Sequence, residues 1–110
     1  MNHLAQKKCI ACEGGIHSLT QKEYTPFLKQ VLGWKVVNQK FLERDFHLRN
    51  FAAALHFVNQ IGKLAEKEGH HPDIFLHGRN KVKLTLFTHA INGLSENDFI
   101  VAAKVNGMVK

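Results

Sequence analysis

Three histidines in the second half of the chain are spaced so that they could share one site. His70 and His71 stand side by side where a helical pattern ends, and His89 ends the second of two strand-like segments that follow. If these strands pair across a turn at residues 78–80, residues near 71 lie opposite residues near 88, and His89 returns to the His70-His71 turn. Imidazole titrates near neutral pH, so this group could transfer protons. The prediction depends on register: a slip by one residue would point His89 away, and one histidine of the adjacent pair could instead cap the helix carbonyls.

Cys9 and Cys12 form a second motif with chemical potential, a Cys-x-x-Cys pair. A structural zinc site needs two further ligands, and neither His3 nor His17 stands at a known zinc spacing. A thioredoxin-like motif lies between a strand and a helix, whereas this pair lies in a glycine-rich stretch. We interpret residues 1–17 as an N-terminal tail with reduced thiols, and we predict no metal and no cofactor.

The composition is that of one globular domain. The 110 residues are 45% hydrophobic and 22% charged, and no run of 18 apolar residues is present that could span a membrane. The N-terminus lacks the apolar stretch of a secretory signal. The net charge is +6, but the basic residues are scattered, which disfavours nucleic-acid binding. We expect a soluble, cytoplasmic protein with a single domain at residues 18–110.

The first helix has two possible starts. Thr20 and Glu23 fit a capping box, which predicts a helix from Thr20 onward. Pro26 would then remove a backbone hydrogen bond inside the helix, so a start at Thr25 with Pro26 as the first residue is the alternative. In both cases Gly33 is expected to end the helix.

A hairpin and a long helix follow. Residues 34–37 and 40–47 read as strands joined at Asn38-Gln39. Asn50 is placed to cap the next helix, and Gly69 to end it. Its apolar stripe is predicted to consist of Phe51, Ala54, Leu55, Val58, Ile61 and Ala65.

The last third contains a second hairpin and a final helix. Residues 74–77 and 81–89 read as strands, and Val82, Leu84 and Leu86 alternate with more polar neighbours on the second strand. Ser95 and Asp98 fit a capping box at the start of the final helix. The order is therefore α-β-β-α-β-β-α, which indicates an α+β fold with a four-stranded antiparallel sheet covered by helices on one face.

The pattern Glu66-x3-His70-His71-Pro72, followed by His89 and then by Asp98, resembles the signature of the pterin-4a-carbinolamine dehydratases. The likeness extends over nearly the whole chain. It includes Gly33-Trp34, Asn80-Lys81-Val82, Thr88-His89, residues 93–99 and the Cys-x-x-Cys segment of many bacterial members. Gly69, Arg79 and Asn97 depart from the family pattern, but all three histidines are present.

The resemblance implies a dehydratase that converts 4a-hydroxytetrahydropterin to quinonoid dihydropterin and water during tetrahydropterin recycling. It implies that His70 and His89 are the acid–base pair and that His71 orients the pterin, with no metal or cofactor. Glu66, Trp34 and Asp98 become substrate-binding candidates. Each also has a structural interpretation: a solvated carboxylate for Glu66, a core side chain for Trp34 and a helix cap for Asp98.

The resemblance also implies partners. Family members form dimers or tetramers, which would cover an edge strand or the outward face of residues 81–88. A phenylalanine hydroxylase would supply the substrate. The alternative function is a protein-interaction module, similar to a transcription-factor dimerisation cofactor, with a vestigial or secondary pterin site. A third hypothesis, a basic nucleic-acid binder, predicts affinity that falls steeply with salt.

Overall fold

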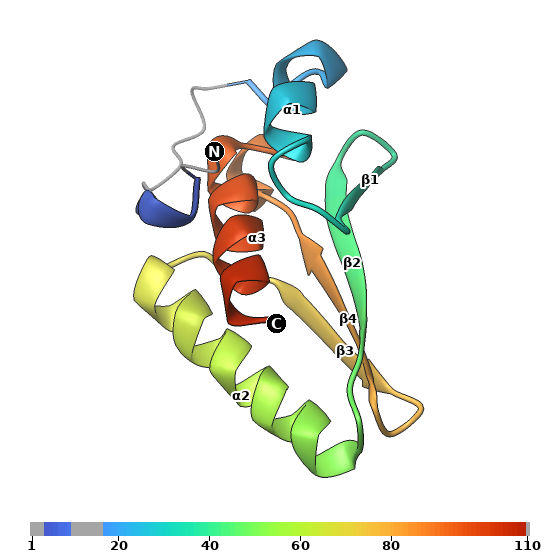
Figure 1. The fold of residues 1–110 in the computed structure, drawn as a ribbon. Helices are drawn as coiled ribbons and strands as arrows, with labels where there is room; N and C mark the ends of the chain where they lie inside the picture. Colours follow the sequence, from blue (N-terminus) through green and yellow to red (C-terminus); the bar gives the residue numbers. More distant parts are fainter. Residues whose placement is uncertain (1–3, 10–16, 110) are drawn as a thin grey trace.

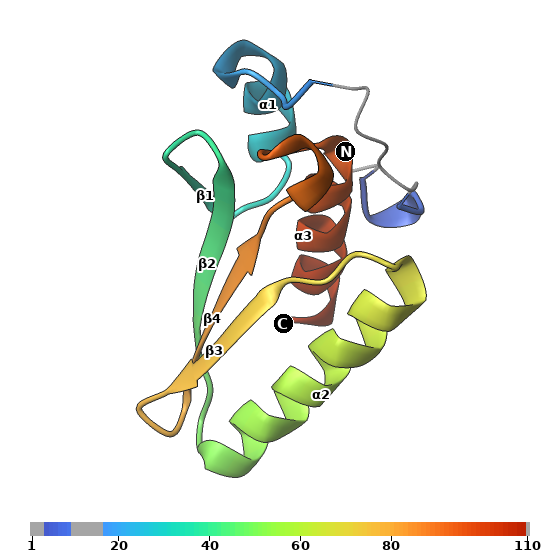
Figure 2. The same cartoon turned by 180° about the vertical axis from the view of Figure 1, so that it is seen from behind.

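The structure, a computed structural model, describes residues 4–9 and 17–109, and these form a sheet with helices on one side. The four strands are antiparallel in the order β1-β2-β4-β3. Helices α1, α2 and α3 all lie on the same face of the sheet (Figures 1 and 2). The elements are η1 (Leu4–Gln6), α1 (Gln21–Leu28), β1 (Lys35–Val37), β2 (Phe41–His47), α2 (Phe51–Glu68), β3 (Asp73–His77), β4 (Lys81–Leu86), η2 (His89–Ile91) and α3 (Glu96–Met108). The predicted α+β class and element order are confirmed.

The helix starts follow the local capping signals. Thr20 is the N-cap of α1, and its side chain and that of Glu23 form the expected reciprocal bonds, so the start at Thr25 is set aside. Pro26 lies inside this helix. The prediction that Gly33 ends the helix was wrong, because α1 ends at Leu28 and Gly33, at φ +89°, closes the turns that follow.

Helix α2 begins and ends as predicted, but its buried face differs. The Asn50 side chain accepts the Ala53 N–H at 2.8 Å, and Gly69 adopts a left-handed conformation at φ +65°. Phe51 and Leu55 of the predicted stripe are exposed. The buried residues of α2 are Ala54, Phe57, Ile61, Ala65 and Glu68. Apolar residues cover so much of the helix that their period alone does not show which flank meets the core.

Strand β4 is shorter than predicted. It ends at Leu86 rather than His89, and His89 begins the short helix η2. The chain turns there because Thr88 and Gly93 exchange backbone hydrogen bonds of 2.9 and 3.3 Å, closing a loop over residues 88–93. The predicted alternation within the strand is confirmed, since Val82, Leu84 and Leu86 are fully buried.

The described part of the N-terminal segment packs against the domain. Leu4 is 2% exposed and belongs to the hydrophobic core, with η1 beside α3 (Figure 1). Residues 4–9 therefore do not behave as the tail that we expected for residues 1–17, and Cys12 lies outside the described residues. None of the helices in residues 4–9 and 17–109 combines the length and apolar character required to cross a bilayer.

Candidate active site

A cleft of about 520 Å³ opens where α2 gives way to β3 and where β4 gives way to η2. Strand register explains why these two segments meet. Asp73 pairs with Thr85 in the antiparallel β3–β4 hairpin, so the residues before Asp73 run beside those after Thr85. The cleft is lined by residues 69–73 and 87–90, which include His70, His71 and His89. The predicted convergence of the three histidines is what the strand register produces.

Asp98 lies beneath the cleft as a buried acceptor. Its side chain is fully buried in the first turn of α3. One carboxylate oxygen accepts the Thr88 hydroxyl at 2.7 Å and the Ser95 backbone N–H at 2.9 Å, and the other lies 2.6 Å from His70 Nε2. Such charge-assisted bonds stabilise an ionised carboxylate away from water. Asp98 therefore contacts His70 rather than the open cleft.

The contact with Asp98 fixes the state of the His70 ring. Because the carboxylate accepts, the ring proton is on Nε2, and Nδ1 is the nitrogen that remains for another partner. The His70 side chain is 12% exposed, so its ring is held in place with a small part open to solvent. This arrangement suits a group that exchanges a proton with a bound molecule.

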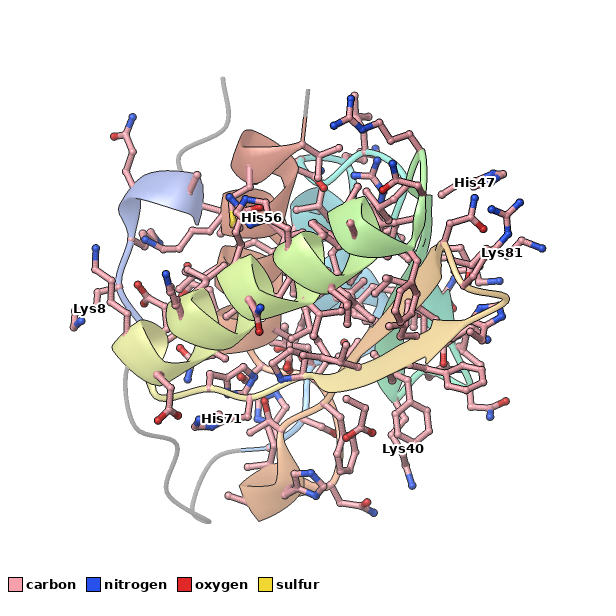
Figure 3. The ribbon with its side chains drawn as sticks, turned by 90° about the horizontal axis from the view of Figure 1, so that it is seen from below. Lys8, Lys40, His47, His56, His71 and Lys81 are labelled. Atoms are coloured by element: carbon pink, nitrogen blue, oxygen red, sulfur yellow. The ribbon has the colours of Figure 1, made fainter. Side chains whose placement is uncertain are left out.

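His71 faces the solvent and pairs with Glu66. The two side chains are hydrogen-bonded through His71 Nε2 and Glu66 Oε2, and 60% of His71 and 78% of Glu66 are exposed. Glu66 lies on the last turns of α2, whereas His71 follows the left-handed Gly69. His71 lines the cleft, whereas Glu66 is not among the lining residues and contacts the site through His71. Figure 3 shows His71 at this end of the molecule, with His47 and Lys81 at the other.

His89 and Phe87 form the opposite wall. His89 is exposed and meets the Phe87 ring edge-on, with ring centroids 4.7 Å apart. Phe87 in turn packs on Phe41 of β2, at 5.0 Å between centroids. Phe87 was not among the predicted site residues, although the alternation along the strand places it on the outward face; it is the aromatic wall of the cleft.

Trp34 lies elsewhere, in the core. It is 6% exposed, its indole N–H donates to Asn106 Oδ1 at 2.8 Å, and its ring packs edge-on against Phe46. Trp34 does not line the cleft. The structure therefore agrees with the interpretation of Trp34 as a core side chain.

Within the described ranges, no group of three or more histidine, cysteine, aspartate or glutamate side chains is arranged to hold a metal ion. The chemistry that these residues themselves offer is proton transfer from imidazole, with one ring oriented by a buried carboxylate.

Residues 17–108 match the family model described as pterin 4 alpha carbinolamine dehydratase. The chain belongs to the pterin-4a-carbinolamine dehydratase family. A relative from Alkaliphilus metalliredigens, named for this dehydratase, is 54% identical over 107 residues and covers 96% of both chains. Family membership confirms the predicted enzyme class, a dehydratase.

Two further comparisons agree with this membership. Pterin-4-alpha-carbinolamine dehydratase 2 of Arabidopsis thaliana is 41% identical over 107 residues, which are 94% of this chain and 57% of that protein. A crystal structure from Brucella melitensis, described as a transcriptional coactivator/pterin dehydratase, superposes with a TM-score of 0.78 at 35% identity. The match covers 86% of this dehydratase-family chain and 100% of the Brucella chain.

Proposed function

We propose that this chain dehydrates a 4a-hydroxytetrahydropterin to quinonoid dihydropterin and water. Family membership supports the reaction class. The observation that carries the proposal is the buried Asp98–His70 pair, which opens into the same cleft that His89 lines. Two imidazoles on two walls of one cleft suit a reaction that requires two proton transfers.

The reaction moves two protons and breaks one carbon–oxygen bond. A proton is delivered to the 4a-hydroxyl, the C4a–O bond breaks, and water leaves with the bonding electrons. A proton leaves the neighbouring N5, and its electron pair forms the C4a=N5 double bond. His70 and His89 divide these two transfers, and each is expected to contribute about 10²–10⁴-fold.

Asp98 orients the His70 ring for proton transfer. The carboxylate accepts the Nε2 proton, so His70 presents Nδ1 to the substrate. Asp98 does not touch the substrate in this scheme. It is a positioning residue rather than the substrate-binding residue that the sequence predicts.

Two further cleft residues are proposed to bind the ring. Phe87 offers an aromatic surface to the flat pterin, and His71, which is hydrogen-bonded to Glu66 outside the cleft, offers a polar contact. In this scheme the product is reduced to the tetrahydropterin by a separate reductase. A phenylalanine hydroxylase is the proposed supplier of the substrate, because pterin-dependent hydroxylation leaves oxygen at position 4a.

We also propose that the chain acts as a homo-oligomer, a dimer or a tetramer. Strands β1 and β3 are the two edges of an open sheet, and Phe75 on β3 is 57% exposed. On α2, Phe51 and Leu55 are 50% and 43% exposed. An unpaired strand edge and exposed apolar side chains are the features that association between copies would cover.

One observation favours a second candidate function. The Brucella protein is described as a coactivator as well as a dehydratase. The open face of the sheet, with the exposed Phe75, is a surface that could bind a protein partner. In that case the pterin site would be secondary or vestigial.

The test is a dehydration assay. The substrate is generated in situ by a phenylalanine hydroxylase, and its decay to quinonoid dihydropterin is followed with and without catalytic amounts of the folded protein. We expect a decay rate that increases in proportion to the protein concentration. A rate equal to that in buffer would overturn the proposal and favour the interaction module.

A further inference from the structure

Glu68 is a buried carboxylate that the proposed reaction does not use. It is the last residue of α2, and its side chain is 2% exposed. One oxygen accepts the Cys9 backbone N–H at 2.9 Å, and the other lies 3.4 Å from Lys104 Nζ on α3. Burial alone would raise the pKa of Glu68, but the Cys9 N–H and Lys104 lower it below its ordinary value. The carboxylate is therefore charged and joins the N-terminal segment to both helices.

Residues 4–9, here called the N-terminal clasp, contact the two helix ends that carry the active-site pair. At the end of α2, Cys9 N–H bonds to Glu68 and Lys8 Nζ donates to the Lys67 carbonyl at 3.4 Å. At the start of α3, Lys7 pairs with Glu96, and the Cys9 thiol donates to the Asn97 carbonyl at 3.6 Å. The clasp thus bridges two elements that are distant in sequence.

The Cys9 thiol acts here as a hydrogen-bond donor. Burial, with the negative charge of Glu68 beside it, raises the pKa of Cys9 to about 12. The sulfur therefore keeps its proton and can donate to the Asn97 carbonyl. This gives the first cysteine of the Cys-x-x-Cys motif a structural contact.

The clasp is anchored by a buried side chain. Leu4 is 2% exposed and packs in the hydrophobic core. Figures 1 and 2, which view the molecule from opposite sides, both show η1 beside α3 and close to the end of α2. Figure 3 shows Lys8 and His71 at this same end of the molecule.

We infer that the N-terminal clasp sets the position of His70 against Asp98. His70 follows Glu68 by two residues, and its backbone N–H still bonds to Ala65 of α2 at 3.2 Å, so it moves with the helix end. Asp98 follows Asn97 directly in the first turn of α3. Because Cys9 touches both Glu68 and Asn97, a change at the clasp changes the spacing of the helix ends and thus of the His70–Asp98 hydrogen bond. The clasp residues are positioning residues, and their effect on catalysis rests on the proposed function.

The experiment removes and restores the central contact in the full-length protein. Glu68→Ala removes the acceptor of Cys9 N–H, whereas Glu68→Gln keeps an amide oxygen that can accept it. Leu4→Ala weakens the anchor from a position far along the clasp. Ile61→Val, a core change in the same helix as Glu68, is the control for loss of stability alone. For each variant we would measure Tm, kcat, KM and the solvent exchange of the His70 ring Nε2–H by NMR.

We expect Glu68→Ala to lower kcat about 10-fold with little change in KM, because a small misplacement of a catalytic group weakens the chemical step more than binding. The His70 Nε2–H should exchange faster in Glu68→Ala and in Leu4→Ala. Glu68→Gln should keep kcat and the exchange of the ring proton close to those of the wild type, and Ile61→Val should lower Tm without changing either.

The inference is overturned if Glu68→Ala and Leu4→Ala lower Tm but leave kcat and the exchange of the ring proton as they are in Ile61→Val. If Glu68→Ala does not fold, Leu4→Ala decides by the same two readouts. If the wild type shows no dehydratase activity, the proposed function fails, and the His70 ring proton alone decides whether the clasp positions the pair.

Discussion

At the scale of single residues, the site depends on where one proton resides. Asp98 accepts from Thr88, Ser95 and His70 at once, and it does so without exposure to water. Since Thr88 O–H donates to Asp98, the Ser95 hydroxyl, 2.9 Å away, donates to Thr88. The other oxygen of the carboxylate has no proton to donate, so the His70 ring carries its proton on Nε2, facing Asp98.

Asp98→Asn is predicted to reduce activity far more than stability. The amide oxygen can still accept from Ser95 and Thr88, but its NH₂ group faces His70 Nε2 and requires that nitrogen to accept, which moves the ring proton to Nδ1. We expect kcat to fall about 10²-fold or more while the fold is retained. Kinetics and the ring-nitrogen chemical shifts of His70 measure both effects. Wild-type kcat in the Asp98→Asn variant would contradict the role of the tautomer.

At the scale of elements, the loop over residues 88–93 carries His89 and depends on close packing at Gly93. A Cβ at this position would lie 2.5 Å from Ser18 Cβ, which is too close for two carbon atoms. Gly93 also exchanges backbone hydrogen bonds with Thr88, and the Thr88 hydroxyl donates to Asp98. A displacement of Gly93 would therefore also displace a partner of Asp98. The loop therefore packs against Ser18, in the segment that precedes α1.

Gly93→Ala is predicted to destabilise the protein by about 1–3 kcal/mol, the usual cost of overpacking. The matched change Gly62→Ala lies within α2, where an added Cβ meets no atom within 4 Å. It should stabilise the protein by about 0.5–1 kcal/mol, because alanine loses less backbone entropy in a helix than glycine. Denaturant unfolding measures both, and equal effects of the two changes would contradict the loop packing.

The contribution of the Glu68 contacts to the free energy of unfolding should depend on pH. The pKa of Glu68 is lowered in the folded state from 4.5, so its contribution to the free energy of unfolding is full above about pH 4.5 and is lost as the pH falls through the lower folded pKa. The difference in unfolding free energy between the wild type and Glu68→Gln should therefore shrink below pH 4.5. Urea unfolding at several pH values tests this, and a constant difference would show that the charge of Glu68 does not contribute.

The local signals in the sequence were sufficient for most element boundaries. Capping at Thr20, Asn50 and Ser95 depends on residues within one turn, so the sequence predicts it without knowledge of the fold. The end of β4 at Leu86 instead depends on the bridge between Thr88 and Gly93, which no periodicity indicates. The same is true of Leu4, whose burial requires α3 as a partner.

At the scale of the whole molecule, helices α1, α2 and α3 cover one face of the sheet and leave the other open (Figure 1). We predict a mass in light scattering of two or four times 12.5 kDa for the wild type. Phe75→Glu on the edge strand β3 and Leu55→Glu on α2 should each be tested, since a charge at the true interface lowers the mass. A monomeric wild type at micromolar concentration would contradict the oligomer proposal.

Part of the site was predictable because it depends on local sequence patterns, as most element boundaries do. The convergence of His70, His71 and His89 follows from hairpin register, which sequence patterns define to within a residue. The sequence indicates Asp98 as a candidate but not its contact with His70, because this contact joins two helix ends that are distant in the sequence. Trp34 illustrates the converse: its type suits a ring-binding wall, but its partner Asn106, on α3, shows that it belongs to the core.

The most direct measurement is kcat/KM for dehydration by the wild type, His70→Ala and His89→Ala, with His56→Ala as the control. His56 is an exposed histidine of α2 that does not line the cleft. We predict that each cleft variant loses about 10²–10⁴-fold while remaining folded. The His56 variant should match the wild type. Wild-type rates in His70→Ala and His89→Ala would contradict histidine acid–base catalysis in this cleft.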